Sequence, residues 1–416
     1  MARALLRFAT AGSVDDGKST LIGRLLYDSK SVFLDQMEAV ENTSRRRGDD
    51  YVNLALLTDG LRAEREQGIT IDVAYRYFAT PRRKFIIADT PGHPQYTRNM
   101  VTGASTADAA LILVDARRPM SEQSRRHAFL ATLLGVRHLV VCVNKMDLVG
   151  YAEEAFRAIV EEFTAFATRL NVTDVAFVPV SALLGDNVAR KGPNLDWYDG
   201  PTLLYHLENL HVASDRNLAD VRFPVQYVIR PQQSRAQDYR GYAGTVSSGV
   251  LKVGDAIMVL PSGFTTTVAA IDGPAGPLRK AYPPMAVVLR LADELDISRG
   301  DLLVRPDNPT EALQDLDLRV CWMDEASELT VGRTLAVKHT TAWARVKIRE
   351  VLYRIDINTL HRDPSVDSLR LNEIGRVRMR CTRPLLMDPY SRQRETGSLI
   401  LVDEATNRTV GAGFLS

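Results

Sequence analysis

Hydrophobic runs of strand length alternate with amphipathic stretches of helix length along the first half of the chain. The apolar runs are LLRFATAG, KFIIADT, AALILVDA, HLVVCVN and VAFVPVS, and the clearest helical pattern is YAEEAFRAIVEEFTAFATRL. Strands separated by helix-length segments indicate right-handed βαβ units and a mostly parallel sheet. The pattern therefore predicts an α/β domain over residues 1–214, with helices on both faces of its sheet.

The pattern changes near residue 215. Short alternating runs such as FPVQYVIRP and DAIMVLPSG follow, punctuated by Gly and Pro, and RPDNPTEA marks a second break. These runs are typical of antiparallel barrels. We predict two β-barrel domains, over residues 215–308 and 309–416. Within the first domain, the polar stretch from Tyr27 to Arg65 predicts a mobile insertion.

Composition narrows the class of protein. The 416 residues are 45% hydrophobic and 25% charged, with 52 Lys and Arg against 51 Asp and Glu. Without a basic excess, we do not expect a nucleic-acid partner. Cys142, Cys321 and Cys381 lie far apart and follow no metal-ligand spacing. No disulfide framework is expected, which fits a reducing cytoplasm, and Cys142 is expected to be buried. With neither a signal peptide nor a run of roughly 18 apolar residues, the chain is expected to be soluble and cytoplasmic, away from membranes.

A phosphate-binding motif follows the first predicted strand. The segment GSVDDGKS matches G-x-x-x-x-G-K-[ST] and opens a helix. Its glycines let backbone N–H groups surround phosphate oxygens, and the helix N-terminus adds a positive end. Lys18 is expected to reach the β- and γ-phosphates, and the Ser19 hydroxyl to bind Mg²⁺. The strand–loop–helix context disfavours a chance glycine turn. The predicted phosphate-binding residues are Gly12, Ser13, Val14, Asp15, Asp16, Gly17, Lys18, Ser19, Thr20 and Gly92.

The second apolar strand of the pattern ends in the segment ADTPGH. Asp89 is expected to contact Mg²⁺ through water, and the Gly92 N–H to approach the γ-phosphate. A neutral His93 imidazole would orient the attacking water. A structural Pro-Gly turn and an ordinary polar histidine are the alternatives. The pairing with the phosphate loop favours the functional interpretation.

Two further strand ends predict recognition of the base. Asn144, Lys145 and Asp147 close the run HLVVCVN. The Asn amide can hydrogen-bond the purine, the Lys stem can lie along the ring, and the Asp147 carboxylate can accept from guanine N1–H and its amine. Adenine has no such donor pair, so the sequence predicts GTP. Ser181, Ala182 and Leu183 follow the next strand, where a backbone N–H of Ser181-Ala182 can reach guanine O6.

With these motifs, the chain resembles translation-factor GTPases such as elongation factor Tu. It is more similar to the GTPase subunit of bacterial ATP sulfurylase, the CysN type, because Asp15-Asp16 and the segment RGYAG match that subunit better. The resemblance runs through nearly the whole chain, from GSVDDGKSTLIGRLLYDS to GSLILVDEATNRTVGAG. One departure is Pro94, where the family usually has an acidic residue.

The resemblance implies several properties. Thr70, in the segment EQGIT, would place its hydroxyl on Mg²⁺ and its N–H on the γ-phosphate. The alternative is that Thr70 simply begins the strand ITIDVAYRYF. The implied catalytic residues are His93, Lys18 and Thr70, and the implied Mg²⁺ ligands are Ser19, Thr70 and Asp89.

The resemblance also implies a function in sulfate assimilation and cysteine biosynthesis. GTP hydrolysis would drive formation of adenosine 5′-phosphosulfate and pyrophosphate from ATP and sulfate, which bind a partner catalytic subunit of the CysD type in a heterodimer. Bifunctional relatives append an adenylylsulfate kinase domain, which this chain is expected to lack. Two alternatives remain: an elongation factor-type GTPase that delivers aminoacyl-tRNA, and a scaffold that binds GTP without hydrolysing it.

Overall fold

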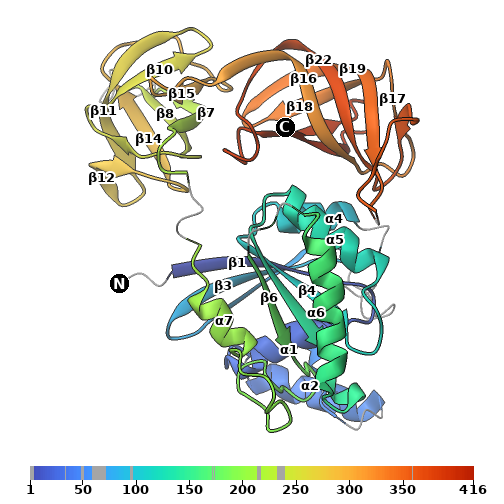
Figure 1. Cartoon of the computed structure of the whole chain (residues 1–416). Coiled ribbons are helices and arrows are strands. Elements are labelled where there is room, and N and C mark those ends of the chain that lie inside the picture. Colours follow the sequence, from blue (N-terminus) through green and yellow to red (C-terminus); the bar gives the residue numbers. More distant parts are fainter. Residues whose placement is uncertain are drawn as a thin grey trace. The chain divides into compact units, whose positions relative to one another are not determined.

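The computed structural model describes most of the chain as two compact units. The described residues are 4–32, 34–47, 51–58, 72–93, 97–170, 172, 174–212, 217–231, 239–357 and 359–416. The division falls after Val212, and the short segment 357–360 is grouped with the first unit. The first unit is an α/β domain, and the second contains the remaining β-strands (Figure 1).

The first unit is built on a six-stranded sheet with the order β2-β3-β1-β4-β5-β6 (Figure 1). The strands are β1 (Ala4–Ala11), β2 (Ala74–Ala79), β3 (Arg83–Asp89), β4 (Ala109–Asp115), β5 (His138–Asn144) and β6 (Asp174–Pro179). All neighbours pair in parallel except β2, which is antiparallel to β3. Every residue of β4 is buried, as expected for a central strand covered on both faces. The predicted mostly parallel sheet is confirmed.

Helices cover both faces of this sheet. The helices of the unit are α1 (Lys18–Asp28), α2 (Leu34–Arg47), α4 (Thr97–Ala104), α5 (Glu122–Leu133), α6 (Glu153–Ala167) and α7 (Leu203–Asn209), with 3₁₀ turns η1 (Leu54–Leu57) and η3 (Met146–Val149). Leu111 and Leu113 of β4 share a core with the leucines of α1 and α7. Successive strand residues point to opposite faces, and α5 also contacts β4.

The polar stretch before β2 contains secondary structure that the sequence pattern did not predict. It contains α2 and η1, and Leu54 of η1 is buried. A Cβ placed on Gly23 of α1 would lie 2.2 Å from the Leu54 carbonyl oxygen, so η1 packs directly on α1. The Ser44 hydroxyl accepts a hydrogen bond from the Asn53 N–H at 2.9 Å. The predicted insertion therefore contains regular structure at residues 34–47 and 54–57, and its mobility stays a prediction.

The second unit contains two closed antiparallel sheets. The first has the order β10-β15-β7-β8-β14-β11-β12 and closes through β10–β11; the second has the order β18-β23-β24-β16-β22-β19-β20 and closes through β18–β19. Each encloses its own apolar core. The predicted pair of antiparallel barrels is confirmed, and we propose residues 215–308 and 309–416 as their limits.

The strand bounds of the first barrel are β7 (Arg222–Ile229), β8 (Gly241–Thr245), β9 (Leu251–Lys252), β10 (Ala256–Leu260), β11 (Phe264–Gly273), β12 (Gly276–Leu278), β13 (Lys280–Ala281), β14 (Ala286–Leu291) and β15 (Leu302–Val304). Those of the second are β16 (Glu311–Trp322), β17 (Leu329–Thr330), β18 (Thr334–His339), β19 (Ala342–Ile355), β20 (Arg362–Asp363), β21 (Ser368–Leu369), β22 (Ile374–Met387), β23 (Ser398–Val402) and β24 (Thr409–Leu415). The short strands pair separately, β9 with β13 and β17 with β21.

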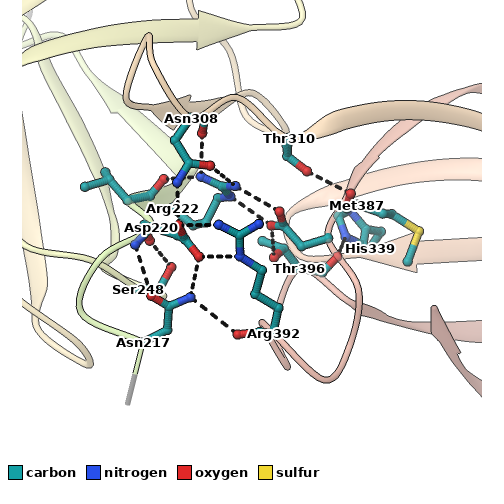
Figure 2. A network of polar contacts seen from close by, with 12 residues as sticks. Asn217, Asp220, Arg222, Ser248, Asn308, Thr310, His339, Met387, Arg392 and Thr396 are labelled. Carbon is teal, nitrogen blue, oxygen red and sulfur yellow. Dashed lines mark hydrogen bonds and ion pairs between the residues drawn. The ribbon is translucent and has the colours of Figure 1, made fainter. Parts of the chain in front are cut away.

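A polar network joins the two barrels (Figure 2). Arg222 of β7 is 1% exposed and donates to both carboxylate oxygens of Asp388, which follows β22, at 2.8 and 2.9 Å. Arg392 makes a second two-bond pair with Asp220, at 2.7 Å for each bond. Burial alone would raise the pKa of Asp388, but the Arg222 and Thr396 hydrogen bonds outweigh it and hold that pKa below its usual range. The network therefore links the barrels through ionised, fully hydrogen-bonded groups.

Two further expectations concern burial and membranes. The side chains of Cys142, Cys321 and Cys381 are all buried, so the predicted burial of Cys142 is confirmed. None of the helices in the described ranges has the length and apolar character needed to cross a bilayer.

Candidate nucleotide-binding site

The phosphate loop connects β1 to α1, and its glycines occupy positions that other residues would strain. Gly12 has φ +152°, and a Cβ there would lie 2.9 Å from the Leu113 carbonyl oxygen. Gly17 has φ +89° and directly precedes α1. Because both positions favour a residue without a Cβ, the backbone path of the loop requires the glycines of the motif.

Lys18 lies over the loop that precedes it. Its Nζ donates to the carbonyl oxygens of Gly12 at 2.9 Å and Ser13 at 2.7 Å. Burial lowers the pKa of Lys18, while the carboxylate of Asp89 opposes that effect. A Cβ on Gly92 would lie 2.4 Å from Lys18 Nζ. The structure thus brings together the two residues predicted to meet the γ-phosphate.

The predicted metal ligands in the described ranges offer oxygen atoms. Asp89 ends β3, is 2% exposed and accepts a hydrogen bond from Thr10 Oγ1 at 3.2 Å. Ser19 lies in the first turn of α1. Among the described residues no group of three or more His, Cys, Asp or Glu is placed to hold a metal ion. One hydroxyl and one carboxylate fit Mg²⁺, which usually keeps several waters and takes phosphate oxygens as ligands.

The remaining predicted residues of the phosphate site are His93 and Thr70. His93 is half-buried and directly follows Gly92. Thr70 and Pro94 lie outside the described residues. The roles of His93 and Thr70 therefore stay predictions.

Asp147 has a buried acceptor atom that the described residues leave unsatisfied. It lies in η3, which follows β5 after Lys145, and its Oδ1 is buried without a hydrogen-bond partner among the described residues. A buried acceptor left unpaired costs about 1–3 kcal/mol. A guanine base, which presents two neighbouring N–H donors, would satisfy this oxygen.

Asn144 connects the phosphate loop to the segment after β6. Its Nδ2 donates to the Asp16 carbonyl oxygen at 2.8 Å, and its Oδ1 accepts from the Ala182 N–H at 3.0 Å. Both ends of the amide therefore have protein partners. The structure gives Asn144 a positioning role between two parts of the site, in addition to the purine contact that the sequence predicts.

The backbone of residues 181–183 differs in detail from the sequence-based expectation. The Ser181 N–H donates to the Asp186 carbonyl oxygen at 3.1 Å, and the Ala182 N–H to Asn144. Of these three amides, only that of Leu183 has no acceptor within the described ranges. Arg24 of α1 fixes this segment by donating from Nε to the Ala182 carbonyl oxygen at 3.2 Å and from Nη2 to that of Leu183. Sequence reasoning missed Arg24.

His127 is a second contributor that sequence reasoning missed. It lies in α5, is fully buried, and its Nδ1 accepts from the Gly12 N–H at 3.0 Å. Its Nε2 lies 2.9 Å from Nε2 of the Gln123 side-chain amide. Burial, with the Lys18 charge nearby, lowers the pKa of His127 to about 3. The neutral imidazole thus holds the first amide of the phosphate loop.

Replacing His127 with glutamine is expected to weaken GTP binding and to flatten the pH dependence of stability. The folded pKa of about 3 lies below the ordinary 6.5, so the neutral imidazole stabilises the fold fully above the higher value. This contribution is lost as the pH falls from the higher value towards the lower, by at most about 1.4 kcal/mol per pH unit. Urea unfolding across this pH window measures the slope. His211→Gln, at an exposed position, is the control; equal slopes in both variants would contradict the assignment.

Comparisons with known proteins agree with this geometry. The family model described as the elongation factor Tu GTP binding domain matches residues 3–237, and the model described as GTP-eEF1A C-terminal domain-like matches residues 315–416. The bifunctional enzyme CysN/CysC of Mycobacterium tuberculosis is 63% identical over 99% of this chain and 67% of its own length. Sulfate adenylyltransferase subunit 1 of Bacteroides fragilis is 51% identical over 99% of this chain and 86% of its own length. A solved structure of Sup35 complexed with GMPPNP aligns at 25% identity and a TM-score of 0.45, over 100% of this chain and 94% of that chain.

The α/β domain, its phosphate loop and the matched GTP-binding model define a GTPase of the translation-factor class. Within that class, the chain shares its fold with elongation factors. The chain belongs to the family of sulfate adenylyltransferase subunit 1, the CysN type, as its sequence predicted.

Replacing Asp147 with asparagine is expected to shift nucleotide preference from GTP to xanthosine triphosphate. The amide presents a donor where the carboxylate accepted, and each lost charge-assisted bond should cost about 1.5–3 kcal/mol. Competition binding of the two nucleotides measures the shift. Asp196→Asn, at an exposed position in the same unit, is the control. An unchanged ratio in the Asp147 variant would refute its role in base recognition.

Proposed function

We propose that this chain is the GTP-hydrolysing subunit of a sulfate adenylyltransferase. GTP hydrolysis here drives the reaction of ATP with sulfate on a partner catalytic subunit, which yields adenosine 5′-phosphosulfate and pyrophosphate. The observation that carries the proposal is the sequence identity to proteins named sulfate adenylyltransferase subunit 1 (51%) and CysN/CysC (63%), each over 99% of the chain. The buried, unpartnered Asp147 oxygen supports guanine as the base.

Different residues of the chain bind the phosphates of GTP, the attacking water and the metal ion. Lys18 neutralises charge on the β- and γ-phosphates, and the loop around it supplies backbone N–H groups. Gly92 leaves room for the γ-phosphate beside Lys18, because any side chain there would meet Nζ. His93 orients the attacking water through its imidazole. Ser19, Asp89 and Thr70 would hold Mg²⁺, which supplies further charge stabilisation at the phosphates when bound.

The partner is a catalytic subunit of the CysD type that binds ATP and sulfate, and the two chains form a heterodimer in the cytoplasm. The sequence contains a single G-x-x-x-x-G-K-[ST] motif, which supports placing ATP on the partner. Because Thr70 and Gly92 are both predicted to sense the γ-phosphate, the surface around them is the natural contact for that partner. Nucleic acid and membranes are not partners in this proposal.

GTP turnover titrated with purified partner tests the proposal. A partner that prefers the GTP-bound state must also tighten GTP binding, because coupling between two sites is reciprocal. We expect the partner to accelerate GTP hydrolysis, and formation of adenosine 5′-phosphosulfate from ATP and sulfate to depend on GTP. Equal GTPase rates with and without partner, and sulfate activation independent of GTP, would refute it. Filter binding to charged tRNA separates the elongation-factor alternative.

A further inference from the structure

A buried carboxylate beside the base site is not used by any of the predicted motifs. Asp115 is the last residue of β4 and is 2% exposed. In the parallel pairing of β4 with β5, Asp115 lies opposite Asn144. This register places the carboxylate next to the segment that ends in Asp147.

Asp115 binds Lys145, the residue whose stem is predicted to lie along the purine. Lys145 Nζ is 3.0 Å from Asp115 Oδ2, and it also donates to the Asp15 carbonyl oxygen in the phosphate loop. Lys145 itself has φ +64°, in the left-handed region. A non-glycine residue keeps such a backbone only where its surroundings determine it. The ammonium of Lys145 is therefore fixed between β4 and the phosphate loop.

The carboxylate is itself held in place. Arg117 donates to it from Nε at 3.0 Å, from Nη2 at 2.7 Å and from its backbone N–H at 3.0 Å. Burial alone would raise the pKa of Asp115, but the hydrogen bonds from Arg117 and Lys145 outweigh it and hold that pKa well below its usual range. Asp115 is thus an ionised anchor with a fixed orientation.

We infer that Asp115 is a positioning residue of the guanine site, which holds Lys145 extended so that its aliphatic stem forms one wall for the purine ring. The inference rests on GTP binding at this site and is independent of coupling to sulfate activation. An ordered Lys145 lowers the entropic cost of binding the base, because a long side chain is immobilised before the nucleotide arrives. The predicted consequence is slower nucleotide dissociation.

Simple charge repulsion predicts the opposite sign. Asp115 is an anion close to a site for a polyphosphate, so its removal would by charge alone tighten GTP binding. Positioning of Lys145 predicts weaker binding after the same change. The Asp115→Asn variant therefore separates the two effects by the direction of the change in affinity.

Stopped-flow kinetics with fluorescent GTP and GDP on the full chain provide the test. For Asp115→Asn we expect dissociation of both nucleotides to accelerate by the same factor of about ten, with association no slower. In a Lys145→Ala background, the same substitution should change dissociation less than about twofold, because positioning acts only through Lys145. Asp317→Asn, which removes a two-bond pair with Arg376 in the second barrel, is the matched control and should leave both rates unchanged.

Two outcomes would overturn the inference. Tighter binding by Asp115→Asn would show that the carboxylate acts by charge repulsion. An equal loss of affinity in the Lys145→Ala background would show that Asp115 acts on the fold of the site, and thermal unfolding of each variant would then reveal the destabilisation. Failure of GTP-dependent sulfate activation with intact nucleotide kinetics would count against the proposed function alone.

Discussion

Lys18→Ala is expected to abolish measurable GTP hydrolysis while leaving the protein folded. The ammonium is buried, and its hydrogen bonds in the structure go to two carbonyl oxygens of its own loop. Burial already lowers the pKa of this group, so the charged form is costly to keep in the absence of phosphate. Removing it should therefore cost the free protein little.

The nucleotide-bound state loses much more. Without Lys18, nothing in the described part of the loop neutralises the β- and γ-phosphates from that side, and removal of one such group typically lowers turnover by about 10²–10³. Calorimetric GTP titration and phosphate release measure the two losses. Lys30→Ala, at an exposed position just after α1, is the matched control. A Lys18 variant that kept its GTP affinity and turnover would refute the phosphate-loop assignment.

Arg222→Met is expected to lower the free energy of unfolding of the barrel unit by about 3–5 kcal/mol, the typical result of breaking a buried ion pair. The substitution leaves Asp388 buried beside Thr396 with its guanidinium partner removed. The large effect comes from this uncompensated carboxylate more than from the attraction that is lost.

A double substitution tests that cause. Arg222→Met combined with Asp388→Leu removes both charges and should recover part of the lost stability. Urea unfolding, followed by hydrogen exchange of β7 and β22, reports on the barrels themselves. Arg345→Met, which breaks an exposed pair with Glu404, should change little. A single Arg222 variant as stable as the wild type would show that the network does not hold the barrels together.

Much of the fold could be predicted because the spacing of hydrophobic residues along each segment indicates its secondary structure. The continuous apolar runs of the first half are typical of buried parallel strands, and the alternating runs of the second half are typical of antiparallel strands. That pattern alone indicates the sheet and the barrels. The polar stretch before β2 was the exception. Leu54 is buried where η1 packs against Gly23 of α1, and such a contact has no local signature.

The same division applies to the site. Residues 12–19, 89–93 and 144–147 are predictable because each motif is contiguous, and a bound phosphate or base needs closely spaced backbone and side-chain groups. The roles of Thr70 and His93 stay predictions. The amides of Ser181 and Ala182 are a different case, because their acceptors, Asp186 and Asn144, are known only once the chain is folded.

The sequence by itself determined which chemical groups this protein brings to a guanine nucleotide, because those groups lie at the ends of strands whose pattern is local. Only the tertiary structure decided what supports them. His127 is 115 residues from Gly12, Arg24 is 158 residues from Ala182, and Arg222 is 166 residues from Asp388. Such contacts arise from strand order and helix placement, and no spacing along the chain encodes them.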